Sequence, residues 1–192
     1  MAASNLGFGG LSGPPPVPPQ TNPGVGGERI VRRTVLVATA AVYAAMYVVL
    51  ALAFSPVSYG VINLRVANIL MGLVPLIGWP AVVGQGLGVF IANQPALGDP
   101  LGPIDLINVV PSLVFAWLLW KLRNKSVFLG LTLYSVALGL TVSYALNYAF
   151  NLPLAVEIPQ VTAGLFIATT ILGYILYKAV KRLGVIQRRF GI

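Results

Sequence analysis

The chain has 192 residues, of which 57% are hydrophobic and 8% are charged, with 12 Lys and Arg against 4 Asp and Glu. Soluble domains carry roughly 25% charged residues, and a water-soluble fold cannot hide several apolar stretches of about 18 residues, so the composition indicates a multi-span membrane protein. The sequence contains no Cys and no His, which excludes disulfides, thiol nucleophiles and Cys-ligated metals and removes the usual general base.

Residues 1–28 differ in composition from the remainder of the chain. They contain six Pro and seven Gly, and a segment of this kind cannot bury an apolar core. We therefore expect two regions, a disordered Pro/Gly-rich tail at 1–28 and a membrane domain at 29–192. A docking role is the alternative to a purely solvated tail.

The membrane domain is predicted to be all-α, with six transmembrane helices. Lipid offers no hydrogen-bond partner to the backbone, so a span must be a helix or part of a closed barrel, and the alternating polarity of barrel strands is absent. The predicted spans are residues 34–54, 61–78, 80–97, 103–120, 126–149 and 159–182. Pro, Gly or charged residues mark their ends, as in the tight reversal Gly78-Trp79-Pro80 and the break at Asn151-Leu152-Pro153. The shorter spans leave open a partly re-entrant course, because crossing the hydrocarbon core takes about 20 residues.

The charges predict the orientation of these helices. With the amino terminus in the cytoplasm, six crossings return the carboxyl terminus to the cytoplasm. All basic residues except Arg65 then lie inside, while Asp99, Asp105 and Glu157 lie outside. This distribution follows the positive-inside rule for a cell-membrane protein. The net charge of +8 therefore requires no nucleic-acid partner, which would need a basic face in water.

Polar side chains gather near the outer ends of five predicted helices, whereas the inner ends carry Lys and Arg. Polar groups within a membrane are costly and are therefore candidates for function. Amides and carboxylates suit a small, planar ligand that donates and accepts hydrogen bonds. The predicted substrate-binding residues are Arg65, Asn68, Asn93, Asp99, Asp105, Asn108, Asn147 and Glu157. The alternative is that they are ordinary helix ends, with Arg65 paired structurally to Asp105 or Glu157.

Small residues spaced four apart predict close helix contacts. In the first span these are Ala40 with Ala44 and Ala41 with Ala45, and the third span has a similar Gly84 and Gly88 pair. A partner helix or internal packing would each explain them.

The sequence shows no catalytic constellation. It lacks a zinc-protease motif, a phosphate-binding loop with Lys, and a Ser nucleophile supported by His. We therefore expect neither an enzyme nor a bound metal or cofactor.

The stretch SPVSYGVINLRVANIL, residues 55–70, resembles the queuosine-precursor (QueT-type) substrate-binding S components of energy-coupling factor transporters. Two further segments match that family's pattern: Ile91-Ala92-Asn93 followed by Leu101-Gly102-Pro103-Ile104-Asp105, and Leu172-Gly173-Tyr174-Ile175-Leu176-Tyr177. The resemblance covers residues 34–183.

This resemblance implies six helices with both termini inside, an outward-facing pocket, and a first helix that docks on a transmembrane coupling subunit. It marks Arg65, Asn93 and Asp105 as pocket residues. The implied docking face is Ala40, Ala41, Ala44 and Ala45. Two ATPase subunits would supply the energy for import.

Two positions depart from the family pattern. Asn68 stands where the family has Glu in the second span, and Leu165 follows Gly164 where another Glu is expected.

The functional hypothesis from the sequence is import of a 7-deazapurine. The alternatives are an S component for another vitamin or small molecule, and a membrane scaffold whose outer polar cluster is an interhelical network.

Overall fold

The computed structural model describes residues 24–55, 65–94 and 102–183, and every regular element within these ranges is helical. The predicted all-α fold is confirmed for this part of the chain. Four of the described helices are long and apolar enough to cross a membrane: Arg33–Ala53, Pro103–Leu122, Val127–Phe150 and Leu154–Leu183. Two shorter apolar helices, Val66–Ile77 and Trp79–Ala92, lie where the second and third spans were predicted.

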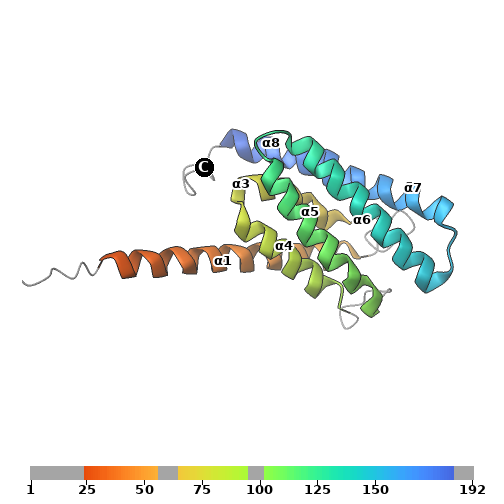
Figure 1. Ribbon diagram of the computed structural model, residues 1–192, viewed down its shortest axis with the longest axis horizontal. Coiled ribbons are helices and arrows are strands. Elements are labelled where there is room, and N and C mark those ends of the chain that lie inside the picture. Colours follow the sequence, from red (N-terminus) through yellow and green to blue (C-terminus); the bar gives the residue numbers. More distant parts are fainter. Residues whose placement is uncertain (1–23, 56–64, 95–101, 184–192) are drawn as a thin grey trace, which may run out of the picture.

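The first helix, α1 (Gly24–Ala53), packs along α4 (Trp79–Ala92) (Figure 1). It begins ten residues before the predicted span and includes the end of the segment predicted as a tail, whose residues 1–23 lie outside the described ranges. Close approach of the two helices depends on Gly84 and Gly88. A Cβ atom at Gly88 would lie 2.8 Å from Cβ of Tyr47. These glycines therefore serve packing within the chain.

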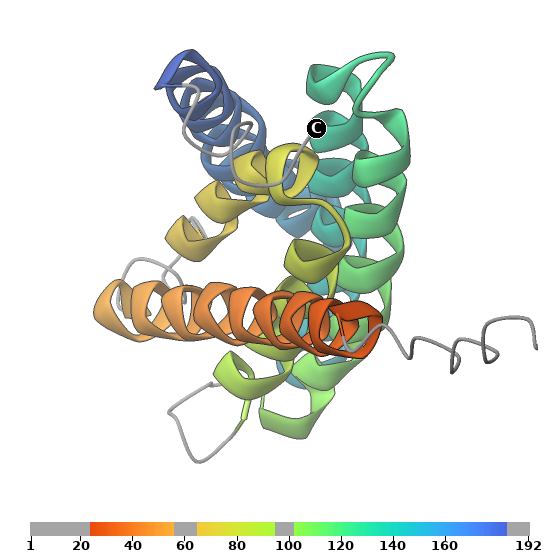
Figure 2. The same ribbon diagram turned by 90° about the vertical axis from the view of Figure 1, so that its left-hand side faces the viewer.

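The chain between Val66 and Ala92 forms two short helices in place of two full-length spans. The first consists of η1 (Val66–Leu73) and α3 (Val74–Ile77), and the second is α4. Gly78 joins the two helices and has a φ of 83°. Glycine readily adopts a positive φ, and the predicted reversal at this residue is confirmed. With a rise of about 2.0 Å per residue in the 3₁₀ helix η1 and 1.5 Å in α3 and α4, each of the two helices extends only about 21–22 Å. Figure 2 shows η1 and α3 between α1 and α8 (Gly173–Leu183).

The next two helices form an antiparallel pair. The turn η3 (Gly102–Asn108) leads into α5 (Val109–Leu122), and α6 (Val127–Phe150) follows. Ser126 caps α6 by accepting a hydrogen bond from the Leu129 amide at 3.2 Å. Asn151, in the left-handed conformation with φ 53°, ends α6. This confirms the predicted break after the fifth span.

The last helix runs from Leu154 to Leu183 as α7 (Leu154–Leu165), a π-helical segment η4 (Phe166–Leu172) and α8. It begins five residues before the predicted start, because Pro159 lies inside the helix and does not open it. The helices α5, α6 and α7 lie side by side along the bundle (Figure 1).

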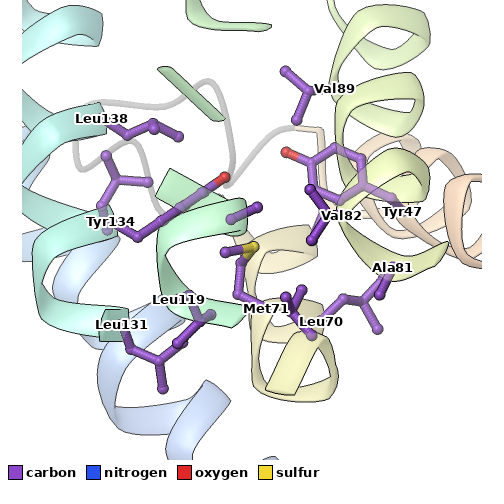
Figure 3. Close-up of a cluster of buried hydrophobic side chains, with 14 of the residues drawn as sticks. Tyr47, Leu70, Met71, Ala81, Val82, Val89, Leu119, Leu131, Tyr134 and Leu138 are labelled. Carbon is purple, nitrogen blue, oxygen red and sulfur yellow. The ribbon is translucent and has the colours of Figure 1, made fainter. Parts of the chain in front are cut away.

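Large apolar side chains from α1, η1, α4, α5 and α6 fill the centre (Figure 3). Met71, Leu119 and Leu131 are fully buried there. Tyr47 and Tyr134 enter from opposite sides, and their hydroxyl groups point inward (Figure 3). Because a buried hydroxyl requires a partner, this core also contains polar contacts.

Candidate functional site

An ion pair lies buried where η1, η3 and the end of α4 meet. The guanidinium of Arg65 contacts the carboxylate of Asp105, and their side chains are 5% and 0% exposed. Nη1 of Arg65 also donates to Oδ1 of Asn93 at 3.4 Å. Nδ2 of Asn93 donates to the backbone carbonyl of Asp105 at 3.1 Å. Asn108 donates to the carboxylate of Asp105. Four predicted site residues therefore form one cluster, the Arg65–Asp105 cluster.

Asn108 in this cluster and Asn68 beside it retain unused hydrogen-bonding groups. Asn68 follows Arg65 by one turn of η1 and accepts a hydrogen bond from the Tyr47 hydroxyl at 3.0 Å. Its Nδ2, like Oδ1 of Asn108, is buried and has no partner within the described residues. An unsatisfied buried polar atom costs about 1–3 kcal/mol. A ligand that accepts from Asn68 and donates to Asn108 would remove that cost.

Deeper in the bundle, Gln85 holds together a second polar network. Tyr43 donates to Oε1 of Gln85 at 3.1 Å, and Nε2 of Gln85 donates to the Tyr134 hydroxyl at 3.0 Å. The hydroxyls of Ser112 and Tyr134 are 2.9 Å apart. All four side chains are buried. This network satisfies its members internally, so we interpret it as structural.

The sequence analysis did not predict this network. A Gln within an apolar helix nevertheless indicates one, because its buried amide must find hydrogen-bond partners. Tyr43 and Tyr47 are four residues apart, as are Asn108 and Ser112, so each pair shares a helix face. Along these faces the polar groups extend from the Arg65–Asp105 cluster into the centre.

The remaining predicted site residues lie away from the Arg65–Asp105 cluster. Asn147 is half-buried near the end of α6, and its Nδ2 donates to the carbonyl of Leu152 at 2.6 Å. Glu157 is half-buried in the first turn of α7 and makes no ion pair within the described residues. Asp99 lies outside the described residues. Leu165, at the second departure from the family pattern, is buried in the core.

Asn147 also lines a hollow of about 650 Å³ between η3 and α6. Its other walls include Ile107, Tyr144 and Tyr148. In a 3₁₀ turn, residues three apart share a face, so Asp105 and Asn108 occupy one face and Ile104 and Ile107 the adjacent one. The hollow and the Arg65–Asp105 cluster therefore lie on neighbouring faces of η3, and the hollow has the size of a small-molecule site.

The predicted docking alanines are divided between two environments. Ala40 and Ala44 are buried, and the carbonyl of Ala40 lies against Gly84, where an added Cβ would be 2.7 Å away. Ala41 and Ala45 are exposed. Internal packing therefore explains the first pair, and only the second pair is free to meet a partner.

Together, the apolar helices and the polar groups buried among them define a multi-pass integral membrane protein with a polar centre near one end. A model of the QueT transporter family matches residues 37–182. The chain belongs to this family, and the protein is a membrane transporter component. Comparisons with curated proteins and with solved structures gave no significant match.

Proposed function

We propose that this protein is the substrate-binding S component of an energy-coupling factor importer and that its substrate is a 7-deazapurine, a precursor of queuosine. The Arg65–Asp105 cluster, which includes Asn108, forms the polar part of the substrate site together with Asn68. The supporting observation is the unpaired Oδ1 of Asn108 in that cluster and the unpaired Nδ2 of Asn68, three residues after Arg65. One unpaired donor and one unpaired acceptor match the mixed donor and acceptor edge of a guanine-like ring.

Tyr144 and Tyr148 in the adjacent hollow supply exposed aromatic surface for a planar ring. Asn147 and Glu157 complete the proposed site, with Asp99 as a further acidic member. A carboxylate pairs with a cationic amine such as that of 7-aminomethyl-7-deazaguanine. Glu157 is suited to this role because it has no ion-pair partner within the described residues.

The orientation that we propose places both termini in the cytoplasm, with six crossings that include the two short helices. The distribution of charge along the helices supports it. Lys121 and Arg123 lie at the end of α5, and Lys181 lies at the end of α8. Asp105 and Glu157 lie at the beginnings of the same two spans. The positive-inside rule then assigns the basic end to the cytoplasm.

Energy for transport would come from partners, namely a coupling subunit in the membrane and two ATPase subunits. Ala41 and Ala45 on α1 are the proposed contact for the coupling subunit. They lie with Val42, Met46 and Val49 on the exposed side of α1. Small side chains on an exposed helix face permit another helix to approach closely.

Calorimetric titration of the purified protein with 7-aminomethyl-7-deazaguanine tests the substrate. We expect micromolar or tighter binding, and replacement of Asn68 or Asn108 by Leu should weaken it by roughly 10-fold or more, because each variant loses a buried hydrogen bond. Asn124→Leu is the matched control, since Asn124 is exposed between α5 and α6. Absence of binding to every deazapurine tested would remove the substrate assignment. Unchanged affinity of both variants would remove the site assignment.

A further inference from the structure

A second hollow, of about 580 Å³, lies at the opposite end of the bundle from the Arg65–Asp105 cluster. It is formed by the start of α6 and the turn before it, together with α8. The cationic residues that line it are Arg123, Lys125, Lys178, Lys181 and Arg182. We call it the basic hollow. Asn108 and Arg123 flank α5, so the basic hollow is about 22 Å from the proposed substrate site along that helix.

No acidic side chain within residues 33–55, 65–94 and 102–183 lines the basic hollow. Within these ranges the acidic residues are Asp105 and Glu157, and both lie at the other end of their helices. From Glu157 to Lys178 the distance along the last helix is about 30 Å. At that distance charges are screened almost completely. Five like charges around one hollow repel one another, and a bound anion relieves that repulsion.

The walls of the basic hollow hold its cations in place and add donors. The rings of Tyr174 and Tyr177 stack with centroids 6.1 Å apart. Nζ of Lys178 lies 4.7 Å from the centroid of Tyr174, and Nζ of Lys181 donates to the Tyr177 hydroxyl at 3.3 Å. The first turn of α6 also borders the hollow. The Leu129 N–H of this turn donates to Ser126. The other leading N–H groups have no intrahelical acceptor, and the helix dipole favours an anion there.

A separate apolar groove of about 460 Å³ lies further along the seam between α6 and the last helix, and it reaches Ile158 near the start of α7. Val136 and Leu140 line one side, and Phe166 and Ile167 line the other. Phe128 joins the two regions, since its ring lies 5.6 Å from Tyr174 in the basic hollow and 6.5 Å from Phe166 in the groove. From Phe128 to Val136, where the groove begins on α6, the distance along the helix is about 12 Å. One leaflet of the hydrocarbon core is about 15 Å thick.

We propose that the basic hollow binds the phosphate headgroup of an anionic phospholipid, with an acyl chain running past Phe128 toward the apolar groove. Cations and aromatic rings at the end of a membrane helix, with an apolar seam that leads from them to a groove, match the amphipathic form of a lipid. An acidic segment of a protein would use the cations and leave the groove empty. The proposal is independent of the substrate and of the coupling subunits.

Native mass spectrometry of the detergent-purified protein tests this proposal, with phosphatidylglycerol, cardiolipin and phosphatidylcholine as probes. We expect the two anionic lipids to bind and phosphatidylcholine to bind far more weakly. The double variant Lys178→Gln/Arg182→Gln should bind the anionic lipids about 25-fold more weakly, since each basic residue near an anionic lipid contributes roughly fivefold in affinity. Its matched control is Arg33→Gln/Lys121→Gln, which removes the same charge from exposed residues outside the hollow and should retain binding.

Three outcomes would overturn the proposal. An equal loss in the control variant would show diffuse attraction without a site. Displacement of phosphatidylglycerol by an equal concentration of inorganic phosphate would show an ion site without a role for the acyl chain. Binding of an acidic peptide by a protein that retains no anionic lipid would assign the hollow to a protein partner. Because the four substituted side chains are exposed or lie at helix ends, gel filtration should show each variant folded.

Discussion

Replacing Asp105 by Asn tests whether the Arg65–Asp105 cluster is held together by charge. The substitution keeps the shape of the side chain but removes the negative charge that the Arg65 guanidinium contacts, in a residue 4% exposed. It also weakens the bond that Asn108 donates to the carboxylate. Breaking a buried ion pair from one side costs about 3–5 kcal/mol, whereas an exposed pair contributes about 0–1 kcal/mol. We therefore expect a loss of about 3–5 kcal/mol in the free energy of unfolding.

Unfolding by SDS in mixed micelles, followed by circular dichroism, measures that loss. The double variant Arg65→Met/Asp105→Leu completes a thermodynamic cycle with the single variants Arg65→Met and Asp105→Leu. It should be less destabilised than the sum of the two, because no unpaired charge remains buried. Glu157→Gln is the control carboxylate, and its effect should stay within about 0.5–1 kcal/mol. A loss below about 1 kcal/mol for Asp105→Asn, or additive effects in the cycle, would refute the reasoning.

Three further changes test packing, the inner network and docking. Gly72→Ala should destabilise the protein by about 1–3 kcal/mol or more, because the added Cβ would lie 2.0 Å from the carbonyl oxygen of Gly173. An unchanged midpoint of SDS unfolding would contradict the close packing of η1 against α8. Gln85→Leu should lower the free energy of unfolding by about 1–3 kcal/mol, measured in the same way, since Tyr43 and Tyr134 lose their shared partner. A stabilised variant would show that the network is dispensable. Ala41→Trp should abolish co-purification of the coupling subunit while ligand affinity in calorimetry stays unchanged, and a partner that still co-purifies would contradict docking at this face.

The presence of the helices and some of their ends could be predicted from local sequence, but the lengths of several helices could not. Gly78 and Asn151 ended helices where predicted, because a left-handed turn and a neighbouring Pro act within a few residues. Pro159 was misleading: it was taken as the start of a helix and lies inside one. The second and third spans are shorter in the described structure than their apolar stretches suggested. Hydropathy reports which residues avoid water and does not report where backbone hydrogen bonding stops.

The sequence by itself determined that this is a helical membrane protein whose amide and carboxylate side chains gather toward one end of the helices. Scarce charge and long apolar stretches are sufficient for that, because transfer into lipid depends on composition. Only the tertiary structure decided that Arg65 pairs with Asp105, that Gln85 meets Tyr43 and Tyr134, and that Ala40 faces inward while Ala41 faces outward. The physical reason is that a polar group in an apolar interior must find a partner, and which partner it meets depends on how distant helices pack.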